Sequence, residues 1–226
     1  MRFNGLRVYD IEESIIASGF PMLEKEIDFE AEVENLKCMI EVYGMYTLIA
    51  MAEEHEKDTI YTSNDLRKAV LHIRRFLKLG NAIANSGHDC ALKGITVNVN
   101  ITAPQHFWLQ WERYHFQDTI SSMSSMHRIT KFDIKTITNE YVDPRALEIL
   151  KEKIDAYNAE PTPENFHRVV NNIPEGIELT RRIITNYLQL KTMYAQRKCH
   201  KMFDWSKNFT MFVKNLPYFE EFTLLG

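Results

Sequence analysis

The chain has 226 residues, of which 45% are hydrophobic and 26% charged, and its formal net charge is −4 at pH 7. This length and composition are typical of a globular protein that buries a core without disulfides or metals, so we expect residues 1–226 to form a single domain. The small negative net charge gives no support to a protein that binds mainly nucleic acid or anionic membranes.

The sequence also predicts the compartment. No apolar run approaches the roughly 20 residues that cross a bilayer, and Asp10 and Glu12 interrupt the apolar residues near the start, unlike the apolar core of a signal peptide. The three cysteines, Cys38, Cys90 and Cys199, are widely spaced and match neither a disulfide framework nor a zinc site. We therefore expect a cytoplasmic protein with reduced thiols.

The first half of the chain predicts two helices and a strand. Residues 31–55 carry apolar side chains at helical spacing and contain no proline. Ser63 is a favourable N-cap for a second helix that runs to Gly80. In "GITVNVNIT", apolar and polar residues alternate strictly from Ile95 to Thr102, which is typical of a strand with one buried face.

Prolines mark three helix starts in the second half. They stand at Pro104, at Asp143-Pro144 and at Thr162-Pro163, and proline is favoured in the first turn of a helix. The helix after Pro104 would carry Gln110 and Arg113. Together these elements predict an α/β or α+β fold, rich in helix, with a central sheet.

The stretch from Glu175 to about His200 predicts one long helix, because it contains no proline and no glycine after Gly176. On such a helix Asn186, Arg197 and His200 fall within about 60° of one another. Arg197 and His200 are one turn apart, so they could contact one phosphate, or they could simply be cations at a helix C-terminus. Asn186 is a poor helix former in the middle of a helix, which favours a hydrogen-bonding ligand there.

A second polar stretch, "QWERYHFQDTISSMSSMHRI", spans residues 110–129. Gln110 and Arg113 share a helix face at i, i+3, and an amide beside a guanidinium suits a phosphate or a pyrimidine carbonyl. An ordinary solvated helix is an equally good interpretation, and His115 and His127 are more readily structural than catalytic. The sequence contains no CxxC, HExxH or glycine-rich phosphate loop, so we expect no metal site.

These stretches, taken together and in this order, resemble the flavin-dependent thymidylate synthases. That family carries a Gln three residues before an Arg-His-Arg triplet, and Gln110 and Arg113 match it in type and spacing. The family also places an Asn twelve residues after a Leu-Pro and an Arg eleven residues later. In "IPEGIELTRRIITNYLQLKTMYAQRKCH", Asn186 follows Pro174 by twelve residues and Arg197 follows Asn186 by eleven.

Other positions match in part. His88 in "SGHDCALKG" corresponds to the first His of a family segment before the strand, and His200 arrives one residue before the family's His. The triplet reads Arg113-Tyr114-His115, so its second and third members differ from the family's His and Arg. The resemblance covers roughly residues 85–205.

The resemblance implies a thymidylate-synthase-complementing-like fold, a homotetramer, and a one-carbon (methyl) transferase that methylates dUMP to dTMP. FAD would be the cofactor, and methylene-tetrahydrofolate and NADPH would be cosubstrates. It assigns dUMP binding to Gln110, Arg113, Ser124 and Arg197, with Arg113 and Arg197 as the catalytic residues. It assigns contacts with FAD to His88, Tyr114, His115, Asn186 and His200.

Two alternatives stay open at the level of sequence. One is a non-catalytic pyrimidine-nucleotide-binding or regulatory protein on the same scaffold. The other is a nucleic-acid or protein interaction module that uses basic residues late in the chain, namely Arg181, Arg182, Lys191, Lys198, Lys201, Lys207 and Lys214.

Overall fold

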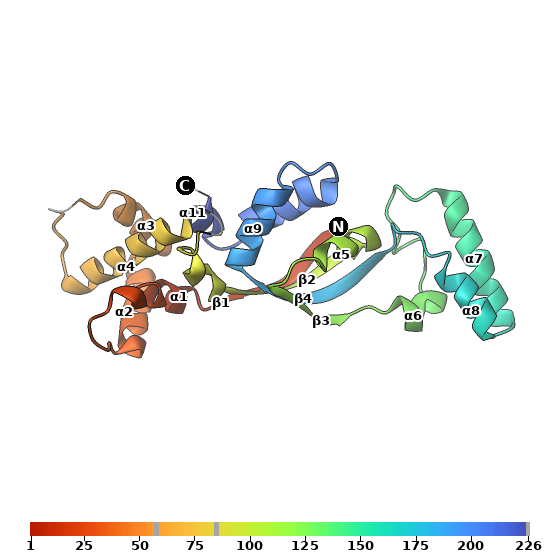
Figure 1. The fold of residues 1–226 in the computed structure, drawn as a ribbon, viewed down its shortest axis with the longest axis horizontal. Coiled ribbons are helices and arrows are strands. Elements are labelled where there is room, and N and C mark those ends of the chain that lie inside the picture. Colours follow the sequence, from red (N-terminus) through yellow and green to blue (C-terminus); the bar gives the residue numbers. More distant parts are fainter. Residues whose placement is uncertain (57–58, 84–85, 225–226) are drawn as a thin grey trace. The chain divides into compact units, whose positions relative to one another are not determined.

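A computed structural model describes residues 1–56, 59–83 and 86–224 (Figure 1). The chain forms two compact units, each assembled from several segments. Unit 1 consists of Met1–Leu6, Asn98–Ile184 and Met202–Asp204, and unit 2 of Arg7–Val97, Thr185–Lys201 and Trp205–Gly226. Within the described ranges, no helix is both long enough and apolar enough to cross a membrane.

A four-stranded antiparallel sheet, most of which belongs to unit 1, places the protein in the α+β class. The strand order is β1-β2-β4-β3, with β1 at Arg2–Tyr9, β2 at Thr96–Pro104, β3 at Gln117–Ser122 and β4 at Glu178–Asn186. The predicted strand with one buried face is confirmed as β2, because Val97, Val99 and Ile101 within it are buried, as is Ile95 just before it.

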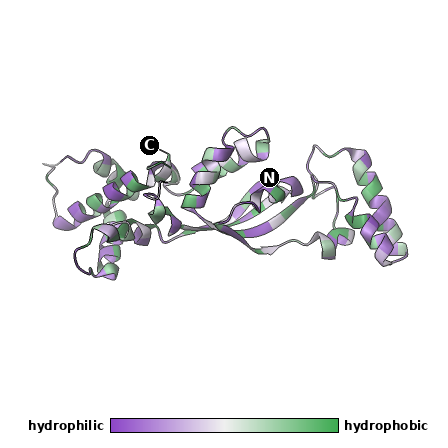
Figure 2. Ribbon diagram, in the orientation of Figure 1, coloured by the Kyte–Doolittle hydropathy of each residue, from purple (hydrophilic) through white to green (hydrophobic). Residues whose placement is uncertain are grey.

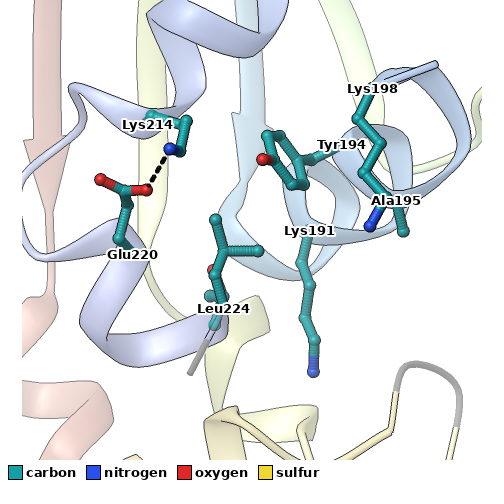
Figure 3. A pocket seen from close by; sticks show the side chains of 8 residues that line it. Lys191, Tyr194, Ala195, Lys198, Lys214, Glu220 and Leu224 are labelled. Carbon is teal, nitrogen blue, oxygen red and sulfur yellow. Dashed lines mark ion pairs between the residues drawn. The ribbon is translucent and has the colours of Figure 1, made fainter. Parts of the chain in front are cut away.

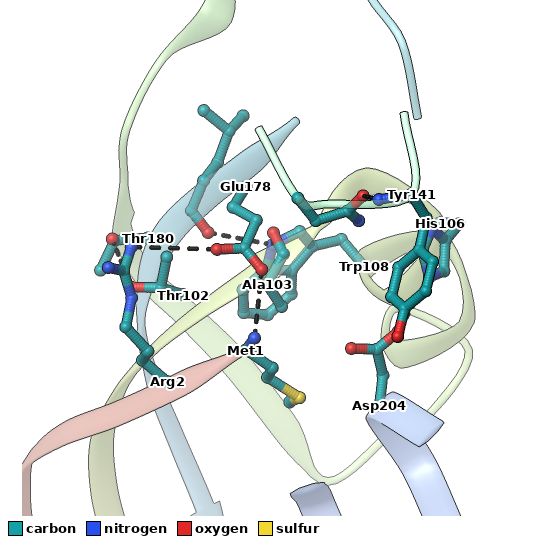
Figure 4. A network of polar contacts seen from close by, with 12 residues as sticks. Met1, Arg2, Thr102, Ala103, His106, Trp108, Tyr141, Glu178, Thr180 and Asp204 are labelled. Atoms are coloured by element: carbon teal, nitrogen blue, oxygen red, sulfur yellow. Dashed lines mark hydrogen bonds and ion pairs between the residues drawn. The ribbon is translucent and has the colours of Figure 1, made fainter. Parts of the chain in front are cut away.

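Helix α5 (Gln105–Trp111) is attached to the sheet through a buried tryptophan (Figure 4). The Trp108 indole N–H donates to the carbonyls of Ala103 in β2 and Leu179 in β4, at 3.1 and 3.2 Å. The hydroxyls of Thr102 and Thr180 lie 2.7 Å apart across the same two strands. Main-chain and side-chain polar groups of β2 and β4 therefore fix the start of α5.

The remainder of unit 1 is helical. Helices α6 (Ser125–Arg128), α7 (Pro144–Ala159) and α8 (Pro163–Val170) and the 3₁₀ turn η3 (Ile129–Lys131) surround a small core. That core contains Ile129, Leu150, Ile154, Val169, Ile177 and Leu179. The two predicted X-Pro starts are confirmed, since Asp143 and Thr162 accept backbone N–H bonds at the beginnings of α7 and α8.

Unit 2 is built around α4 (Asn64–Gly80), which packs against α1 (Ile11–Ala17), α2 (Phe29–Tyr43), α3 (Met45–Glu53) and α11 (Phe219–Thr223). Four short elements complete it: η1 (Phe20–Met22), η2 (Cys90–Lys93), the π-helical η4 (Asp204–Phe209) and α10 (Thr210–Lys214). The first residue of η4, Asp204, is assigned to unit 1. The predicted Ser63 cap of α4 is confirmed. Figure 2 shows hydrophobic and hydrophilic residues on the same helices, the pattern of helices that bury one side.

Two expectations about helices are wrong. Residues 31–55 form two helices instead of one, because Gly44 adopts a positive φ of 78° and separates α2 from α3. Residues 175–200 form strand β4 followed by helix α9 (Tyr187–Arg197). Leu179, Ile183 and Thr185 are buried at alternating positions, and β-branched residues favour a strand there.

Asn186 consequently lies at the junction between β4 and α9 instead of mid-helix. It is the N-cap of α9, and its side-chain oxygen accepts the backbone N–H of Gln189 at 2.9 Å. The predicted stripe shared by Asn186, Arg197 and His200 on one helix is therefore wrong. The capping role explains why an Asn stands at this position.

We expect Asn186→Ala to lower the free energy of unfolding by about 1 kcal/mol, because the α9 cap is lost. Asn186→Asp should retain the cap and leave stability near that of the wild type. Urea denaturation followed by circular dichroism measures both variants. An alanine variant as stable as the aspartate variant would contradict the capping role.

Candidate functional site

The predicted site residues are divided between the two units. Unit 1 contains Gln110, Arg113, Tyr114, His115 and Ser124, and unit 2 contains His88, Asn186, Arg197 and His200. The convergence of Arg113 and Arg197 on one nucleotide therefore stays a prediction. Within each unit the structure shows how these side chains are held.

In unit 1, Gln110 lies on α5 as predicted, but Arg113 does not. Helix α5 ends at Trp111, and Arg113 stands exposed in the turn that leads to β3. The amide of Gln117 fixes this turn, because it accepts from the Trp111 indole at 2.8 Å and donates to the carbonyl of Tyr114 at 3.2 Å. The interpretation of this stretch as one solvated helix is wrong, since β3 follows directly.

Ser124 is half-buried and caps the short helix α6. Its hydroxyl oxygen accepts the backbone N–H of His127 at 3.2 Å. The hydroxyl proton is not used in this bond, so Ser124 can still donate to an anionic oxygen.

In unit 2, Arg197 and His200 gather around Trp205. The guanidinium carbon of Arg197 lies 4.4 Å from the centroid of the fully buried Trp205 ring. The His200 ring packs edge-on against the same indole at 6.5 Å, and its backbone N–H donates to the Arg197 carbonyl. The two residues are neighbours, but α9 ends at Arg197, and His200 stands in the turn that follows the helix. The indole holds the guanidinium plane in one orientation through a cation–π contact.

His88 lines a cavity of about 620 Å³, which we call the His88 cavity. Its wall is largely apolar and comes from α1, η1, α4, η2 and the chain just before η2. The apolar lining consists of Ala17, Pro21, Met22, Leu79 and Ala91, and the polar lining includes Ser18, Arg75, Lys78, His88 and Cys90. An apolar wall with a few convergent polar groups is typical of a site for a small organic ligand.

Arg75 is the most constrained polar group of this cavity. Its Nε donates to the Ser18 hydroxyl at 3.2 Å, and one Nη donates to Nδ1 of His72 at 2.8 Å. A Cβ atom at Gly19 would lie 2.5 Å from the same guanidinium, so position 19 has no room for a side chain while Arg75 is in place. Burial lowers the pKa of Arg75, yet a guanidinium stays charged at neutral pH.

His72 holds the Arg75 guanidinium in place through the hydrogen bond at Nδ1. Burial, followed by the charge of Arg75, lowers the pKa of His72, while Glu32 opposes the shift. A neutral ring can accept from Arg75 at Nδ1 and donate from Nε2 to Glu32, 3.4 Å away. Lys68 pairs with the same carboxylate at 2.8 Å and lowers the pKa of Glu32.

Sequence reasoning missed Arg75 and Lys78, and it named Lys191 only as one of the late basic residues of an interaction module. Arg75 and Lys78 are spaced i, i+3 on α4, a helix whose sequence pattern indicates only a structural role. Lys191 is 5% exposed and pairs with Asp89, which is 1% exposed, at 2.9 Å. The available signal was a lysine among the apolar positions of α9.

A second cavity of about 340 Å³ lies beside α9, α10 and α11 (Figure 3). Lys191 and Tyr194 line it from α9, Lys198 lines it from just after that helix, and the Lys214–Glu220 ion pair, at 2.6 Å, lines another side. Glu220 raises the pKa of Lys214 through this hydrogen bond. None of the predicted site residues lines this cavity.

Four of the seven late basic residues are engaged within the chain, while Lys198, Lys201 and Lys207 are exposed. Arg181 pairs with Glu112 at 2.5 Å and lies over the Trp108 ring, and Arg182 donates to the carbonyl of Gly5. Lys191 and Lys214 are also engaged in ion pairs, as described above. Among the residues with described positions, no group of three or more His, Cys, Asp or Glu could hold a metal ion.

No family model matches the chain, and no curated protein matches it. Solved structures do. The flavin-dependent thymidylate synthase ThyX of Helicobacter pylori, complexed with FAD and dUMP, matches with a TM-score of 0.54 at 13% identity, over 79% of this chain and 92% of that chain. A second structure of Helicobacter pylori thymidylate synthase X with FAD and dUMP matches with a TM-score of 0.53 at 12% identity, over 84% and 91%.

The chain has a thymidylate synthase X fold. The likeness extends over more than nine tenths of both Helicobacter pylori chains. The predicted helix-rich class and the resemblance in fold are confirmed in this respect.

We expect stability to fall as the pH drops below about 6.5, the ordinary pKa of histidine. The folded-state pKa of His72 is lowered, so the unfolded chain binds the proton more readily, and the stability gained above that pH is lost on acidification. Denaturation midpoints between pH 7.5 and 5.5 measure the effect. His72→Gln should flatten the profile, and an unchanged slope in that variant would contradict this assignment.

Proposed function

We propose that this chain is a flavin-dependent thymidylate synthase, a methyl transferase that converts dUMP to dTMP with methylene-tetrahydrofolate and NADPH. The observation that carries the proposal is the likeness in fold to enzymes whose structures contain FAD and dUMP. In this proposal the protein acts in the cytoplasm as a homotetramer.

The His88 cavity fits a flavin nucleotide in chemistry and in size. Its volume of about 620 Å³ lies within the range of roughly 300–1,000 Å³ typical of small-ligand sites. The apolar wall suits a flat ring system, and Arg75 and Lys78 suit a phosphate. His88 would contact the cofactor here, and Tyr114, His115, Asn186 and His200 are the other residues proposed to do so.

When bound, the flavin would supply the hydride that completes the methyl group. The chain's own residues would prepare the pyrimidine. Arg113 and Arg197 would place positive charge against the uracil and its phosphate, and Gln110 would donate and accept hydrogen bonds at the base edge. Positive charge beside a carbonyl oxygen would stabilise the enolate form of the ring, in which C5 carries more electron density and is more nucleophilic. Ser124 would donate its hydroxyl proton to the phosphate.

The Arg197 geometry favours this role over that of a simple helix-end cation. Its guanidinium lies on a fully buried indole, so little rotamer entropy is lost when it binds an anion. Exposed residues such as Lys198 lack this preorganisation.

A non-catalytic nucleotide-binding protein is the second candidate. It is favoured by Tyr114 and His115, which replace the His and Arg of the family triplet. The two candidates can be distinguished experimentally, because only the enzyme needs a bound flavin and converts dUMP to dTMP.

We expect the purified protein to bind FAD and to absorb at about 450 nm, the band of an oxidised flavin. Arg75→Gln should weaken FAD binding by about 10- to 150-fold, the equivalent of losing a charged hydrogen bond. Arg74→Gln, at the exposed neighbouring position on α4, is the matched control and should bind as the wild type. Flavin fluorescence titration measures all three proteins. A colourless protein stabilised by dUMP alone would favour the second candidate.

We expect Arg197→Ala to weaken dUMP binding by about 1.5–3 kcal/mol, because a charged hydrogen bond is lost. Lys198→Ala, the next residue along the chain, should leave binding unchanged. Isothermal titration with dUMP measures the difference. Equal affinities in the two variants would show that Arg197 only completes the end of α9.

A further inference from the structure

Lys191 carries a fully satisfied ammonium inside unit 2. Its Nζ donates to the carbonyl oxygens of Gly80 and Ala82 at 2.8 and 2.6 Å and to the Asp89 carboxylate at 2.9 Å. An ammonium has three donors, so each is used. Lys191 and Asp89 are 5% and 1% exposed.

These acceptors belong to two different parts of the chain. Gly80 is the last residue of α4, and the last carbonyls of a helix lack partners within the helix and carry partial negative charge. Asp89 lies just before η2. Lys191 therefore connects α9 to the end of α4 and to the start of η2 at once.

Both of these parts form walls of the His88 cavity. Helix α4 supplies Arg75 and Lys78, and the residues on either side of Asp89 are His88 and Cys90, which line the cavity. Figure 3 shows that the Lys191 side chain points away from the Lys214–Glu220 pair. Its ammonium instead contacts the end of α4 and the residues just before η2.

We propose that Lys191 is a positioning residue that holds the chain at His88 and Cys90 in place against α4 and so sets the shape of the His88 cavity. The part of this inference that concerns ligand binding rests on the proposed function; the part that concerns the chain segment does not. Without the ammonium, the Asp89 carboxylate and two carbonyls would be buried without their donor, and the segment would move towards water.

The experiment compares Lys191→Met with Lys198→Met. Both positions are on or next to α9 and line the second cavity, but Lys198 is exposed. Hydrogen exchange of the backbone amides in residues 86–93 should become at least 10-fold faster in Lys191→Met and stay unchanged in Lys198→Met. FAD affinity, measured by fluorescence titration, should fall at least 10-fold in Lys191→Met alone.

A double variant separates positioning from general stability. Asp89→Asn combined with Lys191→Met removes both buried charges, and it should melt at a higher temperature than Lys191→Met alone. The carbonyls of Gly80 and Ala82 still lack their donor, so fast exchange at 86–93 and weak FAD binding should persist.

Each outcome decides a different point. If exchange is fast in Lys191→Met but the wild type does not bind FAD, the positioning role is supported and the proposed function is contradicted. If the amides of residues 86–93 exchange as slowly in Lys191→Met as in the wild type, the inference is wrong. It is also wrong if the double variant exchanges these amides as slowly as the wild type. If neither variant folds, Lys191 serves general stability and the inference is wrong.

Discussion

The buried Lys191 ammonium is the constraint that joins α9, the end of α4 and the chain at Asp89 within unit 2. A charge in a protein interior is tolerated only when all of its hydrogen-bonding capacity is met. Here that condition requires the end of α4, the chain at Asp89 and the middle of α9 to be in place together. The geometry of the adjacent cavity follows from the same condition.

Features decided by neighbouring residues could be predicted from the sequence. Ser63, Asp143 and Thr162 each cap a helix by accepting a backbone N–H two or three residues ahead, which is a local property. Strand β2 was predictable for a related reason, since strict alternation leaves no helical interpretation.

Strand β4 could not be predicted, because Leu179 and Ile183 are four residues apart and fit a helix as well as a strand. The choice is made by pairing with β2 and β3, which lie far away in the sequence. The helical interpretation moved Asn186 from a strand–helix junction to the middle of a helix. It thereby hid the capping role that Asn186 has at the start of α9.

The candidate site shows the same division. The closeness of Arg197 and His200 follows from their separation of three residues and the turn between them, whereas the contact of Arg197 with the Trp205 ring depends on tertiary packing. The ion pair of Lys191 with Asp89 joins residues that are 102 positions apart in the sequence, one before β2 and one after β4. Local spacing carries no information about such a pair beyond a lysine at an otherwise apolar position.

Strand β3 has a consequence for the molecule's behaviour in solution. It forms one outer edge of the described sheet, and it exposes Ile120, with Phe116 exposed just before it. An edge strand with exposed hydrophobic side chains and few charges can pair with strands of other molecules, which is a first step of aggregation. This exposed edge at β3 therefore limits the concentration that the monomer can reach before it aggregates.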